Sequence, residues 1–272
     1  MTRIKNVFAQ GKAFIPYITA GDPDIATTPE VLKTLADHGA DMIELGIPFT
    51  DPVADGPTIQ KASERALKNP FHMRDIFGLT EKFRNDGYDT PIILMSYANP
   101  VFVYGFDAFA RDAVAAGIDA ALLTDIPPEE AEEYCAAAGK HNLGTVFLCS
   151  PTTTPERLAR VDTASTAYVY YIARAGVTGA RDDLPADVQQ ALAALKKTLQ
   201  NPLCVGFGIS TPHHASVMAR HADGVIVGSA LVKLFEEFSG EDLLHKIAEM
   251  TAAMKDAIRT AETATEKEAA HA

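Results

Sequence analysis

Short apolar segments recur along almost the whole chain, and their pattern is that of strands buried on both faces. They are too short for helices and mostly lack the apolar/polar alternation of a half-exposed strand. Continuous apolar strands of this kind are typical of parallel sheets. The eight predicted strands are residues 14–19, 41–45, 91–96, 120–124, 145–149, 168–172, 203–206 and 224–227.

Helical patterns with clear starts and stops lie between these strands. Thr28-Pro29-Glu30 begins one helix, which Gly39 ends, and Ser210-Thr211-Pro212 begins another. In the last helix, apolar residues recur at helical spacing from Leu243 to Ile258 and mark a core-facing stripe. Eight strand–helix units in a row predict an α/β fold, a closed (β/α)8 TIM barrel in one domain spanning residues 1–272. A doubly wound open sheet is the alternative, but the absence of a break in composition favours closure.

The two ends of the chain carry separate expectations. A helix over residues 3–8, with Ile4, Val7 and Phe8 on its apolar side, is expected to cap the bottom of the barrel. From about residue 261 to residue 272 the composition is acidic and lacks large apolar side chains. That segment is expected to be a disordered tail.

Charge and cysteine content narrow the class of protein. The net charge is −12, and Lys/Arg-poor surfaces do not suit nucleic acid or anionic membranes. No apolar stretch approaches the roughly 18–20 residues of a membrane span, and residues 1–10 are polar and mixed in charge, without the apolar core expected of a signal peptide. Cys135, Cys149 and Cys204 form no C-x-x-C pair, which favours reduced thiols over disulfides or zinc. These features predict a cytoplasmic protein.

Uneven spacing between strands indicates where function lies. The second predicted strand starts at residue 41 and the third at residue 91, while the sixth starts at 168 and the seventh at 203. Both intervals are longer than the others. Because the loops after barrel strands build the catalytic face, long loops after strands 2 and 6 are expected to be functional.

Two carboxylates stand out at the second strand. Glu44 lies inside the apolar run 42–45, where burial raises the pKa of a carboxyl group and suits it to general acid–base chemistry. Asp55 follows in a loop stiffened by prolines at positions 48, 52 and 57. The alternative is that Glu44 belongs to a buried polar network and Asp55 only shapes a turn.

Glycine-rich segments follow three consecutive strands and indicate an anion site. They contain Gly179 after the sixth strand, Gly208 after the seventh, and Gly228 with Ser229 after the eighth. Glycine lets backbone N–H groups approach an anion, and barrels frequently bind phosphate after strands 7 and 8. Each glycine alone could serve only a turn, but three such segments together favour phosphate.

Missing residue types narrow the reaction further. No predicted strand carries a lysine for Schiff-base chemistry, and no histidine cluster indicates a metal. His213-His214 is read as a solvated first helical turn, since adjacent helical residues do not face the same way. Carboxylate acid–base chemistry on a phosphorylated small molecule remains. Large side chains near the strand ends could line a pocket or simply belong to the core: Tyr17, Phe49, Met95, Tyr170 and Phe207.

Residues 43–60, IELGIPFTDPVADGPTIQ, resemble the signature of the tryptophan synthase alpha subunit family. Segments 14–23, 96–100, 125–130, 174–179, 206–210 and 228–233 resemble that family in the same order. The resemblance covers nearly the whole chain apart from the acidic tail. Thr50 stands where the family more often has serine, which preserves a hydroxyl group.

The resemblance implies a carbon–carbon lyase of tryptophan biosynthesis that splits indole-3-glycerol phosphate into indole and glyceraldehyde 3-phosphate. It assigns the proton transfers to Glu44 and stabilisation of the charge at the indole N–H to Asp55. The other implied roles are phosphate binding by Gly179, Gly208, Gly228 and Ser229, loop closure by Thr178, and an indole pocket of Tyr17, Met95, Tyr170 and Phe207.

The resemblance also implies a partner, the pyridoxal-phosphate-containing beta subunit of an alpha2beta2 complex, and no cofactor or metal in this chain. The segments 51–52 and 99–102 are the expected docking face. Two alternatives stay open. One is another phosphate-binding barrel, a sugar-phosphate isomerase or a flavin oxidoreductase; the other is a non-catalytic activating subunit, against which the presence of Glu44 and Asp55 speaks.

Overall fold

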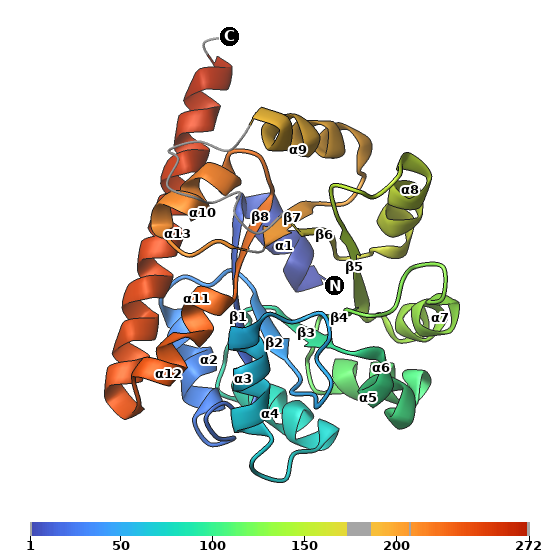
Figure 1. Ribbon diagram of the computed structural model, residues 1–272, viewed down its shortest axis with the longest axis vertical. Coiled ribbons are helices and arrows are strands. Elements are labelled where there is room, and N and C mark those ends of the chain that lie inside the picture. Colours follow the sequence, from blue (N-terminus) through green and yellow to red (C-terminus); the bar gives the residue numbers. More distant parts are fainter. Residues whose placement is uncertain (1, 173–185, 207, 271–272) are drawn as a thin grey trace.

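A closed barrel of eight parallel strands forms the centre of the computed structural model, which describes residues 2–172, 186–206 and 208–270 (Figure 1). Each strand pairs with its neighbours in sequence, and β8 pairs with β1. Pairing of the first strand with the last excludes the open sheet and confirms the predicted barrel. The strands are β1 (Ala13–Thr19), β2 (Ile43–Gly46), β3 (Ile92–Ser96), β4 (Ala120–Leu123), β5 (Gly144–Cys149), β6 (Tyr168–Ile172), β7 (Leu203–Gly206) and β8 (Gly224–Val227).

All eight predicted strands are present, and the largest boundary shift is at the start of β2. Asp41 was expected inside this strand, but its side chain accepts a hydrogen bond from the Phe14 backbone N–H at 2.6 Å. Its carboxylate also pairs with Lys255 at 2.6 Å. Asp41 therefore anchors the turn before β2, and the strand begins at Ile43.

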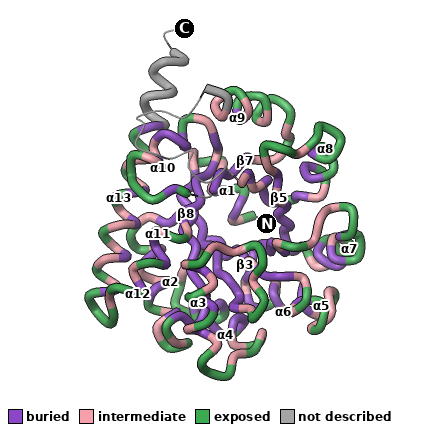
Figure 2. Tube along the Cα trace, in the orientation of Figure 1, coloured by how far each residue is buried: buried purple, intermediate pink, exposed green. Residues whose placement is uncertain are grey.

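Helices surround the barrel, with buried strands at the centre and exposed helix faces outside (Figure 2). Two helices, α3 and α4, account for the long interval after β2. The long loop expected after β6 falls on residues 173–185, outside the described residues. The helices are α1 (Thr2–Gln10), α2 (Thr28–Asp37), α3 (Pro57–Ala66), α4 (Met73–Asn85), α5 (Ala98–Tyr104), α6 (Phe106–Ala115), α7 (Glu132–His141), α8 (Pro155–Ala164), α9 (Ala186–Thr198), α10 (Pro212–Ala219), α11 (Ser229–Val232), α12 (Leu234–Glu237) and α13 (Gly240–Ala270).

The N-terminal helix α1 caps the barrel as the sequence predicts. Ile4 is buried among side chains of the barrel interior, and Val7 and Phe8 pack against the same cluster. The Phe8 ring meets the Tyr168 ring edge-on, with centroids 6.3 Å apart. In Figure 1, α1 lies inside the ring of outer helices.

The last helix, α13, packs its predicted apolar stripe into the layer between barrel and helices. Leu243, Ile247, Met254 and Ile258 are buried there. The helical backbone extends to Ala270, past residue 261, while the side chains after Ala261 lie outside the description. The disordered tail therefore stays a prediction. Across the described part of the chain, no helix has both the length and the apolarity that crossing a membrane requires.

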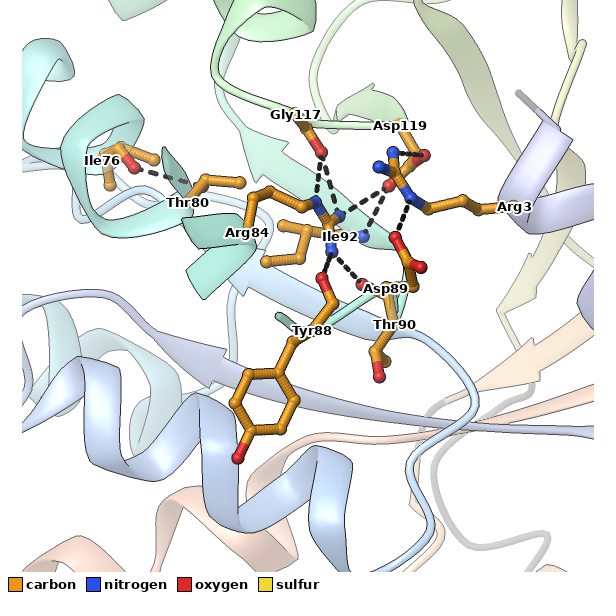
Figure 3. Close-up of polar contacts among 10 residues, drawn as sticks. All are labelled: Arg3, Ile76, Thr80, Arg84, Tyr88, Asp89, Thr90, Ile92, Gly117 and Asp119. Atoms are coloured by element: carbon orange, nitrogen blue, oxygen red, sulfur yellow. Dashed lines mark hydrogen bonds and ion pairs between the residues drawn. The ribbon is translucent and has the colours of Figure 1, made fainter. Parts of the chain in front are cut away.

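An arginine that is mostly covered by the fold ties together the ends of β3 and β4 that face away from the loops after the strands (Figure 3). The Arg84 guanidinium donates to the backbone carbonyls of Gly117, Tyr88 and Thr90 at 2.8–3.0 Å. It also pairs with the Asp119 carboxylate at 2.9 Å. Every N–H group of the guanidinium thus has an acceptor, as a largely desolvated arginine requires.

Asp119 extends this network to two further elements. It accepts the Ile92 backbone N–H at 3.1 Å and pairs with Arg3 of α1 at 3.2 Å. The Asp119 side chain is only 3% exposed, against 12% for Arg84 and 38% for Arg3. Removing Arg84 would therefore leave a buried carboxylate and three carbonyls with too few donors.

We expect Arg84→Met to lower the free energy of unfolding by about 3 kcal/mol, because breaking a buried pair leaves its partner uncompensated. Urea unfolding followed by circular dichroism measures this loss. Arg3→Met is the matched control: this arginine is more exposed, and its loss is expected to lower stability by about 1 kcal/mol or less. Equal losses in the two variants would contradict a special role for Arg84.

Candidate active site

Glu44 is a fully buried carboxylic acid inside the barrel. It lies on β2, where register pairs it with Tyr17 of β1 and Ile93 of β3. The residue is 1% exposed, and Oε1 accepts a hydrogen bond from the Tyr168 hydroxyl at 3.0 Å. The barrel thus holds one carboxyl group in a fixed orientation by a single hydroxyl donor from the opposite wall.

Burial raises the pKa of Glu44 to about 7, although the hydrogen bond from Tyr168 acts in the opposite direction. Burial dominates because the ionised form loses its hydration, while one neutral donor restores only part of it. Near neutral pH both the acid and its conjugate base are therefore populated. A group of this kind can donate and accept a proton within one reaction cycle.

Asp55 lies in the connection from β2 to α3, where backbone contacts fix its position. Its N–H donates to the carbonyl of Pro52 at 3.0 Å, and its carbonyl accepts from the Gln60 side chain at 2.9 Å. Gly56 then caps α3 in an extended conformation, and Pro57 is its first residue. The pKa of Asp55 is raised by burial and lowered in part by the Tyr97 hydroxyl beside it.

The two carboxyl groups converge on the same aromatic side chains. The pKa of Tyr17 is raised chiefly by burial and further by the charges of Asp55 and Glu44. Burial also raises the pKa of Tyr170, with contributions from the same two carboxylates. Glu44, Asp55, Tyr17 and Tyr170 therefore share one end of the barrel. Met95 joins them, packing against both the barrel interior and Tyr17.

Two glycines make room for the tyrosines of this group. A Cβ atom on Gly46 would collide with the Tyr17 hydroxyl, and one on Gly206 would collide with the Tyr170 hydroxyl. Both tyrosine rings therefore lie across neighbouring strand ends, where any larger residue would displace them. The sequence analysis assigned these glycines to no such role, because the contact depends on barrel register.

Glycines after β7 and β8 lie near the same end of the barrel. Gly208 adopts a positive φ of 78° before α10. A Cβ atom on Gly228 would lie 3.6 Å from the Cβ atom of Tyr17, so the two residues are in contact range. Gly228 directly precedes Ser229, the first residue of α11. Helix α11 packs on β1 and α3. Gly179, Thr178 and Phe207 lie outside the described residues.

Two tyrosines that the sequence analysis missed complete the surroundings of the acids. Tyr168 bonds to Glu44, and the alternation within β6 places it two residues before Tyr170, on the same face of the strand. That alternation could have placed Tyr168 on the same face as Tyr170, but it does not indicate Glu44 as its partner. Tyr97, at the end of β3, contacts the segment that carries Asp55. In the sequence, Tyr97 could have been recognised as a site residue only from its position directly after a predicted strand.

A separate cavity of about 450 Å³ opens at the other end of the barrel. Its lining includes Phe8, Lys12, Lys196 and Asp223, and Leu203, the first residue of β7. Lys196 and Asp223 pair with each other at 2.8 Å. Neither Glu44 nor Asp55 lines this cavity, so it is not part of the candidate site.

Potential metal ligands do not gather anywhere in the three described stretches, where no group of three or more His, Cys, Asp and Glu side chains occurs. His214 contacts the Ser210 hydroxyl at 3.3 Å, and its backbone N–H donates to the Thr211 cap. The latter contact confirms the predicted hydroxyl cap before Pro212.

Comparison with known proteins gives a consistent result. The family model for the tryptophan synthase alpha chain matches residues 5–265. Alpha chains from Geobacter sulfurreducens and Chromobacterium violaceum are each 46% identical, covering 95% of this chain and 99% and 100% of theirs. The solved alpha subunit from Legionella pneumophila is 39% identical, with a TM-score of 0.87 over 96% of this chain and 99% of its own. Tryptophan synthase from Mycobacterium tuberculosis, in its open form, gives 34% identity and a TM-score of 0.84, over 94% of this chain and 98% of that one.

Proposed function

The chain belongs to the tryptophan synthase alpha chain family, and we propose that Glu44 and Asp55 carry the chemistry of its reaction. The family's enzyme is a lyase of tryptophan biosynthesis that splits indole-3-glycerol phosphate into indole and glyceraldehyde 3-phosphate, with no cofactor of its own. The observation that carries the proposal is a buried carboxyl group with a pKa of about 7, sharing two tyrosine neighbours with a second carboxyl group.

Glu44 performs two proton transfers in this mechanism. In its protonated form it delivers a proton to C3 of the indole ring, which gives a cationic indolenine. Its carboxylate then removes the proton from the hydroxyl group on the side-chain carbon next to the ring. As that O–H bond breaks, the carbonyl of the aldehyde forms and the carbon–carbon bond releases its electron pair to the ring. The products are indole and the aldehyde, and Glu44 regains its proton.

Asp55 stabilises the intermediate between these two transfers. Protonation of C3 places positive charge on the ring nitrogen, and an ionised carboxylate at the N–H lowers the energy of that state. The backbone contacts of Asp55 and the rigid start of α3 hold the carboxylate in advance. Its charge therefore acts without reorganisation when the cation forms.

Binding groups for the rest of the substrate surround the two acids. Tyr17, Met95 and Tyr170 flank the indole ring, and Phe207 is assigned to the same pocket from the sequence. Gly208, Gly228 and Ser229 bind the phosphate through backbone N–H groups, with help from the Ser229 hydroxyl. Their positions after β7 and β8 support this assignment. Gly179 in the phosphate site and Thr178 in loop closure stay predictions.

Indole release from indole-3-glycerol phosphate by the purified chain tests the proposal. Steady release by the protein alone, rising when a tryptophan synthase beta subunit is added, is the expected result. A folded protein that binds glycerol phosphate but releases no indole in either assay would reject the lyase mechanism. Release that does not rise when the beta subunit is added would contradict the coupling. The matches over 95% of the chain favour this reaction over those of other phosphate-binding barrels.

The beta subunit, which carries pyridoxal phosphate, is the proposed partner in an alpha2beta2 complex. Within the docking face expected from the sequence, Phe102 of α5 is 65% exposed, whereas Val101 is buried in the core and cannot contribute to it. Val53 and Val103, which directly follow the two expected segments, are 84% and 77% exposed and extend the proposed face. Exposed apolar side chains of this size are typical of protein–protein contact sites.

We expect Phe102→Asp to weaken association with the beta subunit at least about tenfold, because it places a charge in an interface that excludes water. Calorimetric titration measures the change in Kd. Ile25→Asp serves as the control, since Ile25 is also an exposed apolar residue, in the loop after β1. If both substitutions weaken binding equally, the docking face is not at α5.

The remaining proposals concern organisation and location. Residues 1–272 form one domain, since every strand from β1 to β8 belongs to one closed barrel. The protein is proposed to be cytoplasmic, which suits its three free cysteines and the family's place in amino-acid biosynthesis.

A further inference from the structure

Tyr97 contacts the Asp55 segment at two points. The residue is 3% exposed and lies between β3 and α5. Its hydroxyl oxygen accepts a hydrogen bond from the Ala54 backbone N–H at 2.9 Å. Its ring stacks on Phe49, with centroids 5.2 Å apart and an interplanar angle of 29°. Phe49 and Ala54 both belong to the connection from β2 to α3, so one tyrosine holds this segment near each of its ends.

The bond from Ala54 leaves the hydroxyl hydrogen of Tyr97 available for an acceptor. A tyrosine hydroxyl has one donor hydrogen, and accepting from an N–H does not use it. The carboxyl group of Asp55, one residue after Ala54, interacts with this hydroxyl. The interaction lowers the pKa of Asp55 and raises that of Tyr97, as a bond from a hydroxyl to a carboxylate would.

We propose that Tyr97 is a positioning residue of the lyase reaction, whose hydroxyl bridges the Ala54 N–H and the Asp55 carboxylate and fixes where that carboxylate meets the indole N–H. The inference rests on the proposed role of Asp55. Tyr97 acts through Asp55 and transfers no proton itself. Stacking on Phe49 fixes the position of the Tyr97 ring, and the Tyr97 hydroxyl orients the Asp55 carboxylate.

Two other titratable side chains also interact with Asp55, and their charge states must be known before the effect of Tyr97 can be assigned. The charges of Asp55 and Glu44 both raise the pKa of Tyr17 of β1 and of Tyr170 of β6. Burial raises the pKa of each of these tyrosines, so they stay neutral across the working pH range. Among the described residues, Tyr97 is the hydrogen-bond partner that lowers the pKa of Asp55, so loss of its hydroxyl removes a donor that favours the ionised form.

The test compares Tyr97→Phe, Asp55→Asn and the double variant in the full-length chain, with indole release as the assay. Tyr97→Phe is expected to lower kcat about tenfold, the loss of one hydrogen bond to a charged group, with a smaller change in KM. The acid limb of its pH–rate profile is expected to move to higher pH, because Asp55 loses a donor to its ionised form. Tyr88→Phe is the control: its hydroxyl bonds to Asp37 at 3.0 Å, away from the site.

The double variant decides whether Tyr97 acts through Asp55. If it does, the double variant is no slower than Asp55→Asn alone, because the group that Tyr97 positions is already absent. Multiplied losses, or an unchanged acid limb in Tyr97→Phe, would overturn the proposal. A mild effect of Asp55→Asn itself would instead reject the proposed role of Asp55. Circular dichroism over the same pH range shows whether the variant stays folded, which separates a shift of the acid limb from acid unfolding.

Discussion

Replacing Glu44 by glutamine is expected to lower indole release at least about a thousandfold, within the range that a general acid–base residue contributes. The amide has nearly the shape of the carboxyl group, but it neither donates a proton to the indole ring nor removes one from the hydroxyl group. Its oxygen can still accept the hydrogen bond from Tyr168. The barrel and the phosphate site are therefore expected to stay intact.

Three measurements separate chemistry from folding in this variant. Indole release gives turnover, circular dichroism gives the folded state, and calorimetry with glycerol phosphate gives phosphate binding. Glu132→Gln, on the exposed face of α7, is the control for the same chemical change outside the barrel. Turnover at the wild-type rate in Glu44→Gln would remove Glu44 from the mechanism.

The free energy of unfolding of Glu44→Gln is also expected to depend on pH differently from that of the wild type. Below pH 4.5 the Glu44 carboxyl is protonated in both the folded and the unfolded chain. As the pH rises to about 7, the unfolded chain ionises first, so the wild type loses stability across this window. The raised pKa corresponds to about 3 kcal/mol. Glu44→Gln lacks this loss, and its stability relative to the wild type is expected to increase from pH 5 to pH 8.

The barrel was predictable because each of its strands is a local feature of the sequence. A run of apolar residues buried on both faces needs no knowledge of its neighbours, and all eight runs became strands. The burial of Glu44 and its raised pKa were predictable for a related reason, because a carboxyl group inside such a run loses its hydration. Asp41, at the edge of its run, could not be distinguished from a strand residue until its bonds to Phe14 and Lys255 were seen.

The partners of the two acids were not predictable, because they depend on which side chains the closed barrel brings together. Tyr168 is distant in sequence from Glu44, and only the closed ring of strands places its hydroxyl on that carboxyl group. Tyr97 reaches Ala54 from the end of a different strand. Hydrophobic periodicity indicates whether a residue faces the core, but it does not indicate which polar group that residue contacts there.

Replacing Asp55 by asparagine is expected to lower kcat about a hundredfold with a smaller change in KM, the pattern of an interaction made mainly in the transition state. The amide oxygen can still accept a hydrogen bond from the indole N–H, so ground-state binding is largely preserved. The backbone bonds of residue 55 to Pro52 and Gln60 do not involve the carboxyl group and also remain. What is lost is the negative charge that opposes the cation.

Asp51→Asn is the matched control for Asp55→Asn, measured in the same assay without the partner. Asp51 lies in the same loop, is exposed, and accepts a hydrogen bond from Thr50 at 2.6 Å. If charge anywhere in the loop supported the reaction, both substitutions would slow it. A large loss confined to residue 55 would mean that the carboxylate acts by contact with the ring nitrogen. A mild loss there would mean that the cation is stabilised elsewhere, and that Glu44 works without a second acid.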